Sequence, residues 1–139
     1  MDLDPDVQAF AERQRVARLG TIGPDGMPHL VPVVFAWLDG RCYTAVDEKP
    51  KRTQRLQRLR NIEADPRATL LLDAYDEDWS SLGWVMLRGR AELVADAAER
   101  ERAVAALRTK YPQYRDMALD GPVVRFAPER ITRWGNLEE

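Results

Sequence analysis

Several features that mark common classes of functional site are scarce in this sequence of 139 residues. Cys42 is the only cysteine, so an internal disulfide is impossible and nothing indicates an oxidising compartment. Its place in an expected strand favours a buried, inert thiol over a reactive one. His29 is the only histidine, and one histidine with one cysteine cannot make a structural zinc site. We therefore expect no metal site.

Strong charge bias and long apolar runs are also missing. Lys and Arg number 21 and Asp and Glu number 23, which gives a net charge of −2. A dedicated nucleic-acid binder usually has a strongly basic domain, so no nucleic-acid partner is expected. No apolar run approaches the length of a membrane span, and the N-terminal segment MDLDPDVQAF is too acidic and polar for a signal peptide. These features predict a cytoplasmic protein that folds as one domain over residues 1–139.

Hydrophobic periodicity and turn signals divide the chain into short elements. Helices are expected at residues 5–18, from the turn near 50 to residue 65, and at 96–111. Strands are expected at residues 19–22, 28–38, 41–46, 67–75, 83–94 and 123–134, with a hairpin turn at Asp39-Gly40 and a bulge at Gly89. The order lacks the alternating rhythm of a parallel sheet. It predicts a mainly β (α+β) fold, a six-stranded antiparallel barrel with three peripheral helices.

One segment combines a strand, a basic turn and a helix: RCYTAVDEKPKRTQRLQRLRNIEAD, residues 41–65. Its turn and first helical residues carry six cations in a chain that is slightly acidic overall: Lys49, Lys51, Arg52, Arg55, Arg58 and Arg60. Cations beside the free N–H groups of a helix start are suited to a phosphate. The same residues could equally form a solvated charged turn and helix face.

Longer stretches carry a family resemblance. LGTIGPDGMPHLVPVVF, YTAVDEKPK, RLRNIEADPRATLLLD and WVMLRGRAEL together resemble the pyridoxamine-phosphate-oxidase-like, flavin-binding split β-barrel proteins. The sequence looks most similar to the F420-dependent branch found in actinobacteria. The resemblance implies a six-stranded split barrel and a homodimer with two flavin-type sites in the grooves between the chains. It covers nearly the whole chain but contains no catalytic signature, so we assign no catalytic residue.

The resemblance also implies where a cofactor would lie. In the family, basic and hydroxyl residues after the third strand hold the cofactor phosphate. Counted forward from that strand, the phosphate-binding cation falls near Lys51, which favours the group Lys49, Lys51, Arg52 and Thr53. Counted back from Asp65-Pro66, it falls on Arg58, which is the second choice. The ring would lie against the backbone of the second strand, where Pro32 and Val33 are found.

For each of three further side chains, two roles are compatible with the sequence. His29 is either a half-buried strand residue or a pocket residue near the ring. Trp79, in a polar loop, is either a dimer-interface anchor or a lid over the cofactor. Arg88, beside Gly89, could reach the anionic cofactor or pair with an acid.

The function favoured by these observations is an oxidoreductase that uses coenzyme F420 to transfer a hydride to or from an unknown organic substrate. Such an enzyme needs little acid–base machinery of its own, because the cofactor carries the chemistry. The cations exceed the need of one phosphate and would suit the acidic oligoglutamate tail of F420. The alternatives are an FMN-binding oxidase or reductase, and a non-enzymatic protein that carries a flavin or a haem.

Overall fold

The computed structural model describes residues 2–47 and 56–138 of the chain. The described helices are α1 (Pro5–Arg13), α2 (Gln57–Ala64) and α3 (Ala97–Lys110), with short 3-10 turns η1 (Trp79–Ser81) and η2 (Pro112–Tyr114). The described strands are β1 (Ala17–Ile22), β2 (Pro28–Val33), β3 (Ala36–Leu38), β4 (Arg41–Ala45), β5 (Arg67–Ala74), β6 (Gly83–Leu93) and β7 (Val123–Gly135). Within the described ranges, no helix is long and apolar enough to cross a membrane.

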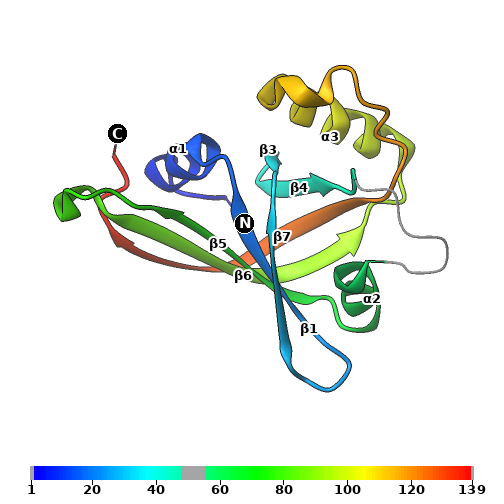
Figure 1. Ribbon diagram of the computed structural model, residues 1–139, viewed down its shortest axis with the longest axis horizontal. Coiled ribbons are helices and arrows are strands. Elements are labelled where there is room, and N and C mark those ends of the chain that lie inside the picture. The colour runs from blue at the N-terminus through cyan, green and yellow to red at the C-terminus, as the bar shows by residue number, and fades with distance from the viewer. Residues whose placement is uncertain (1, 48–55, 139) are drawn as a thin grey trace.

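The strands form one antiparallel sheet in the order β2-β1-β5-β6-β7-β4-β3, which curls into a half-barrel (Figure 1). The prediction of a mainly β, antiparallel split barrel with three helices is confirmed. The described residues form seven strands instead of six, because the strand expected at residues 28–38 is divided. Phe35, between β2 and β3, is fully buried, and its N–H donates to the Tyr111 hydroxyl (3.1 Å) and not to a neighbouring strand. The two halves of that stretch therefore lie at opposite ends of the strand order.

Alternation along the strands separates a buried inner face from an outer face. Leu19, Leu70, Leu72, Val85 and Leu87 point inward and are at most 2% exposed. Helices α1 and α2 cover this inner face from two sides, with Phe10 of the first and Ile62 of the second in the same apolar cluster. Helix α3 packs against β3 and β4 and closes a second apolar cluster (Figure 1). The inner face of β1, β5 and β6 is thus occupied by core packing.

The first helix is shorter than expected. We predicted a helix to Arg18, but α1 ends at Arg13, and Gln14 has an extended backbone. The reason is tertiary, because residues 17–22 pair with both β2 and β5. The hydrogen bonds of two ladders outweigh the helical spacing of these residues.

Local turn chemistry behaves as the sequence predicted. Asp39 and Gly40 have φ angles of 53° and 75°, as a primed two-residue hairpin turn requires. The β6–β7 register shifts between Arg88 and Gly89, which confirms the bulge. A Cβ atom at Gly89 would lie 2.0 Å from the carbonyl oxygen of Ala127, so only glycine fits there.

A buried ionic network fastens α3 to the sheet. Asp96 caps the helix by accepting a hydrogen bond from the N–H of Glu99 (2.8 Å). The Glu99 carboxylate, 8% exposed, accepts hydrogen bonds from the Tyr43 hydroxyl (2.6 Å) and from Nη1 of Arg125 (2.8 and 2.9 Å). This network joins α3 to β4 and β7.

Candidate functional site

A row of side chains crosses the outer face of the sheet. Leu30 on β2 lies opposite Gly20 on β1, and Gly20 lies opposite Thr69 on β5. Thr69 lies opposite Arg88 on β6, which in turn lies opposite Arg130 on β7. Residues directly opposite each other in an antiparallel sheet share a face. Five strands thus place an apolar side chain, a gap, a hydroxyl and two guanidinium groups side by side.

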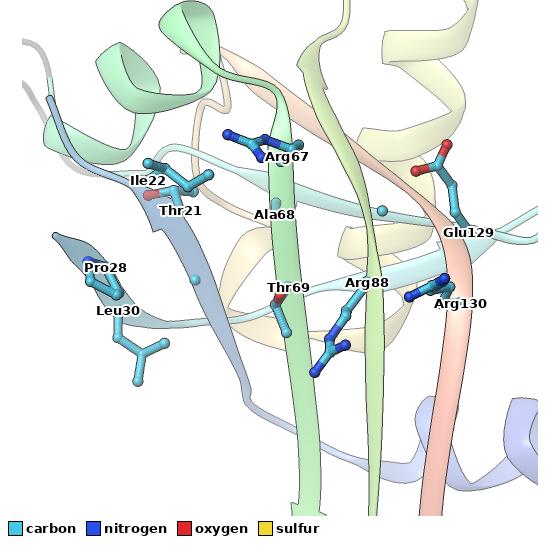
Figure 2. A pocket seen from close by; sticks show the side chains of 12 residues that line it. Thr21, Ile22, Pro28, Leu30, Arg67, Ala68, Thr69, Arg88, Glu129 and Arg130 are labelled. Atoms are coloured by element: carbon cyan, nitrogen blue, oxygen red, sulfur yellow. The ribbon is translucent and has the colours of Figure 1, made fainter. Parts of the chain in front are cut away.

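This row crosses a hollow of about 640 Å³ on the outer face, called the outer-face hollow below (Figure 2). Its lining comes from five strands, β1, β2, β5, β6 and β7: Gly20, Thr21, Ile22, Pro28, Leu30, Arg67, Ala68, Thr69, Arg88, Gly89, Glu129 and Arg130. The β1–β2 side is apolar and the β5–β7 side carries three arginines. Such a site suits a flat, largely apolar ligand with an anionic group at one end.

Gly20 has no side chain in the middle of the row, and the Leu30 side chain packs closely against it. A Cβ atom built there would lie 3.3 Å from Cδ1 of Leu30 and 3.7 Å from the carbonyl oxygen of Thr69. It would therefore stand between the apolar and the polar side of the hollow. Glycine weakens a strand, and one inside a strand often marks a close approach of a ligand or another backbone. Gly20 thus leaves strand backbone, and no side chain, in the wall of the hollow between Leu30 and Thr69.

The arginines of the hollow differ in their partners. Nη2 of Arg67 is 2.7 Å from the Asp65 carboxylate, and this guanidinium lowers the pKa of Asp65 to about 2. Glu129 lies 3.7 Å from Arg90, on the next exposed position of β6. Within the described residues, neither Arg88 nor Arg130 has an ion-pair partner. The hollow therefore keeps uncompensated positive charge on its β6–β7 side.

Two of the predicted site residues lie at or beside the hollow. Arg88 lines it. His29 sits between two lining residues of β2, Pro28 and Leu30, but strand alternation turns its side chain to the other face. There it lies opposite the buried Thr21, and its Nδ1 atom is buried without a hydrogen-bond partner in the described part of the chain.

Three others lie outside the lining of the hollow. Pro32 is exposed on the outer face opposite Arg18, whereas Val33 is buried in the core. Trp79 lies in η1, in the loop between β5 and β6, and is 71% exposed. Such exposure of a tryptophan agrees with either reading of its role, as interface anchor or as lid.

The predicted phosphate ligands are only partly placed. Lys49, Lys51, Arg52 and Thr53 lie outside the described residues, so their role stays a prediction. Arg58 is half-buried on α2, and its Nε atom has no hydrogen-bond partner in the described ranges. Nearby, the Tyr114 hydroxyl donates to Asp47 (2.7 Å), and burial followed by this bond raises the pKa of Tyr114. Arg58 thus lies near Tyr114 and Asp47, just after the end of β4.

Other sequence expectations can be checked directly. Cys42 is 3% exposed, which confirms the prediction of a buried cysteine, and burial raises the pKa of its thiol. In the part of the chain that the structure describes, no three His, Cys, Asp or Glu side chains are grouped for a metal ion.

Sequence reasoning missed most of the hollow. Gly20, Thr69 and Arg130 were not singled out, although each lies in a segment that was correctly expected to be a strand. A signal did exist, because strand alternation places these residues on the outer face. Which strands are neighbours, and in what register, was needed to bring them together.

Comparisons with known proteins agree with this fold. The family model described as Pyridoxamine 5′-phosphate oxidase matches residues 3–135. No curated protein matches the chain in sequence. Among solved structures, a conserved hypothetical protein from Mycobacterium tuberculosis aligns with a TM-score of 0.80 at 26% identity, covering 97% of this chain and 86% of that chain.

Two more solved structures are similar at lower identity. A heme binding protein from Mycobacterium smegmatis aligns with a TM-score of 0.76 and 23% identity, covering 96% of this chain but only 56% of that one. An FAD-binding protein from Mesorhizobium loti aligns with a TM-score of 0.69 and 22% identity, covering 94% of both chains. At these identities the two structures support the fold. The family match over residues 3–135, together with the curled antiparallel sheet, shows that the chain belongs to the pyridoxamine 5′-phosphate oxidase family.

Proposed function

We propose that this protein is an oxidoreductase that binds a flavin-type cofactor, with coenzyme F420 as the preferred one and FMN as the alternative. The observation that carries the proposal is the outer-face hollow, which combines an apolar wall, bare strand backbone at Gly20 and a cationic side. Family membership and the similarity in fold to an FAD-binding protein support it. When bound, the deazaflavin would supply the hydride chemistry.

The residues of the hollow fit the shape and charge of such a cofactor. Leu30 and Ile22 offer an apolar wall for one face of a ring, and Gly20 leaves its backbone accessible. The arginines of β5–β7 are suited to the anionic part. The role of the protein would be to bind and orient the cofactor and to keep water from its ring.

Charge favours F420 over FMN. FMN carries one phosphate, whereas F420 carries a phosphate and an oligoglutamate tail. The chain offers Arg88 and Arg130 in the hollow in addition to the predicted phosphate ligands at Lys51 and Arg52. This amount of positive charge exceeds what one phosphate needs.

A haem carrier is the second candidate, because a heme binding protein shares the fold. Haem iron is normally held by His, Cys, Met or Tyr. None of the described residues that line the hollow is of these types. A flavin-type ligand therefore suits the lining better than a haem.

We also propose that two copies associate through the outer face. Leu30 is 68% exposed there, and Trp134 lies on the same sheet opposite Trp84 and is 52% exposed. Large apolar side chains at such exposure are common in protein interfaces. A second copy would cover them and would narrow the opening of the hollow.

The decisive experiment is a fluorescence titration of the purified protein with F420, FMN and haem. We expect binding of F420, and weaker binding of FMN. A double variant, Lys51→Ala with Arg52→Ala, should lose at least ~tenfold in cofactor affinity, because a charged hydrogen bond contributes about 1.5–3 kcal/mol. Arg102→Ala, at an exposed position of α3, serves as the control. Binding of haem alone, with no affinity for either flavin, would contradict the proposal.

A further inference from the structure

The neighbouring positions of Arg88 and Arg130 run against the usual arrangement of charges on a sheet. The two residues lie directly opposite each other on β6 and β7, and both are exposed. Like charges in this position destabilise a sheet, whereas opposite charges stabilise it. Arg67 and Arg90 form a second such pair on β5 and β6, but each of them has an acidic partner, Asp65 and Glu129 respectively. Arg18, on β1, is likewise paired with Asp73.

The bulge explains why no acid among the described residues neutralises this pair. After Arg88 and Arg130, the next opposed residues are Gly89 and Pro128, so Glu129 is the additional residue of β7. Its carboxylate lies 3.7 Å from Nε of Arg90, not between the two guanidinium groups. The acid nearest in sequence is thus directed to another arginine, and the bulge is fixed by Gly89, where a Cβ atom would collide with the backbone of β7.

The surroundings of the pair complete an anion site. Thr69 lies opposite Arg88 in the same row and adds a hydroxyl group, which can donate or accept. All three residues line the outer-face hollow (Figure 2). A guanidinium group presents its N–H donors in a planar fork that matches phosphate and carboxylate oxygens. Two forks on neighbouring strands can contact different oxygens of one anion.

We propose that Arg88 and Arg130 form a clamp that binds a phosphate or carboxylate group of a ligand seated in the outer-face hollow. The anion belongs either to the cofactor tail or to an anionic organic substrate. Only this identification of the ligand rests on the proposed function, and the existence of the clamp does not. Without an anion the two cations repel each other, and with one they are bridged. The pair therefore costs stability in the free protein and provides affinity in the complex.

The test uses the whole chain and inorganic phosphate as the probe, with sodium chloride at matched ionic strength as the reference. Phosphate should raise the Tm of the unsubstituted protein. Arg88→Gln and Arg130→Gln should each weaken phosphate binding at least ~tenfold in calorimetric titration, whereas Arg102→Gln should leave it unchanged. In phosphate-free buffer at low salt, Arg130→Gln should be at least as stable as the parent, because the repulsion is removed.

Two results would overturn the clamp. One is that phosphate fails to raise the Tm of the unsubstituted protein. The other is an effect equal in the parent and in both glutamine variants. Retained stability of Arg130→Gln separates a loss of binding from a loss of folding.

A second pair of titrations identifies the carrier of the anion. It compares F420 with a deazaflavin that lacks the phosphate and the glutamate tail. If Arg130→Gln weakens only F420, the clamp holds the cofactor tail. If it leaves both deazaflavins unchanged but abolishes phosphate binding, the clamp holds a second, anionic reactant. Phosphate binding without any deazaflavin binding would refute the proposed cofactor and leave the clamp standing.

Discussion

The buried ionic network on α3 gives the sharpest prediction for stability. Glu99→Gln keeps the size of the side chain but removes its charge, which leaves Arg125 with only the Glu92 carboxylate at 3.1 Å. The amide nitrogen of the new side chain would also replace an oxygen that accepts from Tyr43 or Arg125. The substitution therefore breaks a hydrogen-bonded ion pair from one side.

The magnitude follows from burial. Removing one partner of a buried ion pair costs about 3–5 kcal/mol. The Arg125 side chain is 23% exposed, so the lower end of this energy range applies. A loss of about 3 kcal/mol is a large part of the roughly 5–15 kcal/mol that stabilises a native domain. At about 4 °C per kcal/mol for a chain of this length, Tm should fall by about 12 °C.

Urea unfolding followed by tryptophan fluorescence at pH 7 measures this loss. Glu101→Gln, at an exposed position of the same helix, is the matched control and should change the free energy of unfolding by less than about 0.5 kcal/mol. A loss below about 1 kcal/mol for Glu99→Gln would mean that the network acts as an ordinary surface ion pair. The reasoning from burial would then be refuted.

Acid provides an independent check with a defined sign. The Tyr43 hydrogen bond, followed by the Arg125 ion pair, lowers the pKa of Glu99 in the folded state. The unfolded chain therefore takes up this proton first as the pH falls, and the stability provided by Glu99 is lost below about pH 4.5. The difference in free energy of unfolding between the parent and Glu99→Gln should be largest at pH 7 and should decrease as the pH falls below about 4.5.

Two further predictions concern the hollow and the last residue of α3, Lys110. Gly20→Val should fill the centre of the hollow beside Leu30 and weaken flavin-type cofactor binding at least ~tenfold in fluorescence titration. The control, Thr132→Val, lies on β7 outside the lining and should leave the cofactor affinity unchanged. Equal cofactor affinities for both variants would exclude the hollow as the binding site of the ring. Burial lowers the pKa of Lys110 to about 8, and its Nζ lies 3.7 Å above the Phe35 ring and donates to the Gln14 carbonyl. An NMR titration of ¹³C-methylated lysines should find one lysine midpoint near pH 8, and Lys110→Met should lack this midpoint. A lowered lysine pKa makes the free energy of unfolding rise between about pH 8 and 10, and the variant should lose this rise as well. A midpoint for Lys110 near the ordinary value of about 10.4 would contradict this assignment.

Local patterns in the sequence were sufficient for most elements. The apolar alternation of β6, the Asp39-Gly40 turn and the Asp96 cap each involve residues a few positions apart, and each formed as predicted. Such features depend on backbone geometry and on hydrogen bonds within one turn or strand. The bulge at Gly89 was likewise expected, since glycine inside a strand marks such a site.

Boundaries that depend on distant partners were not predictable in the same way. The first helix ended early because residues 17–22 join two strands, and the stretch 28–38 was divided because Phe35 bonds to Tyr111 of another element. A short apolar segment is compatible with several neighbours. The competition among them is decided by the whole sheet.

The sequence by itself determined that the chain folds as a mainly β protein of this family, with cations gathered around Lys51 and a single buried thiol at Cys42. Only the tertiary structure decided that Arg88 and Arg130 lie side by side over a hollow with Gly20 at its centre. The physical reason is register, because the pairing of one strand with the next selects which distant side chains share a face. The alternation of side chains along a strand fixes the face of the sheet on which each residue lies. It does not determine which residues of other strands lie beside it.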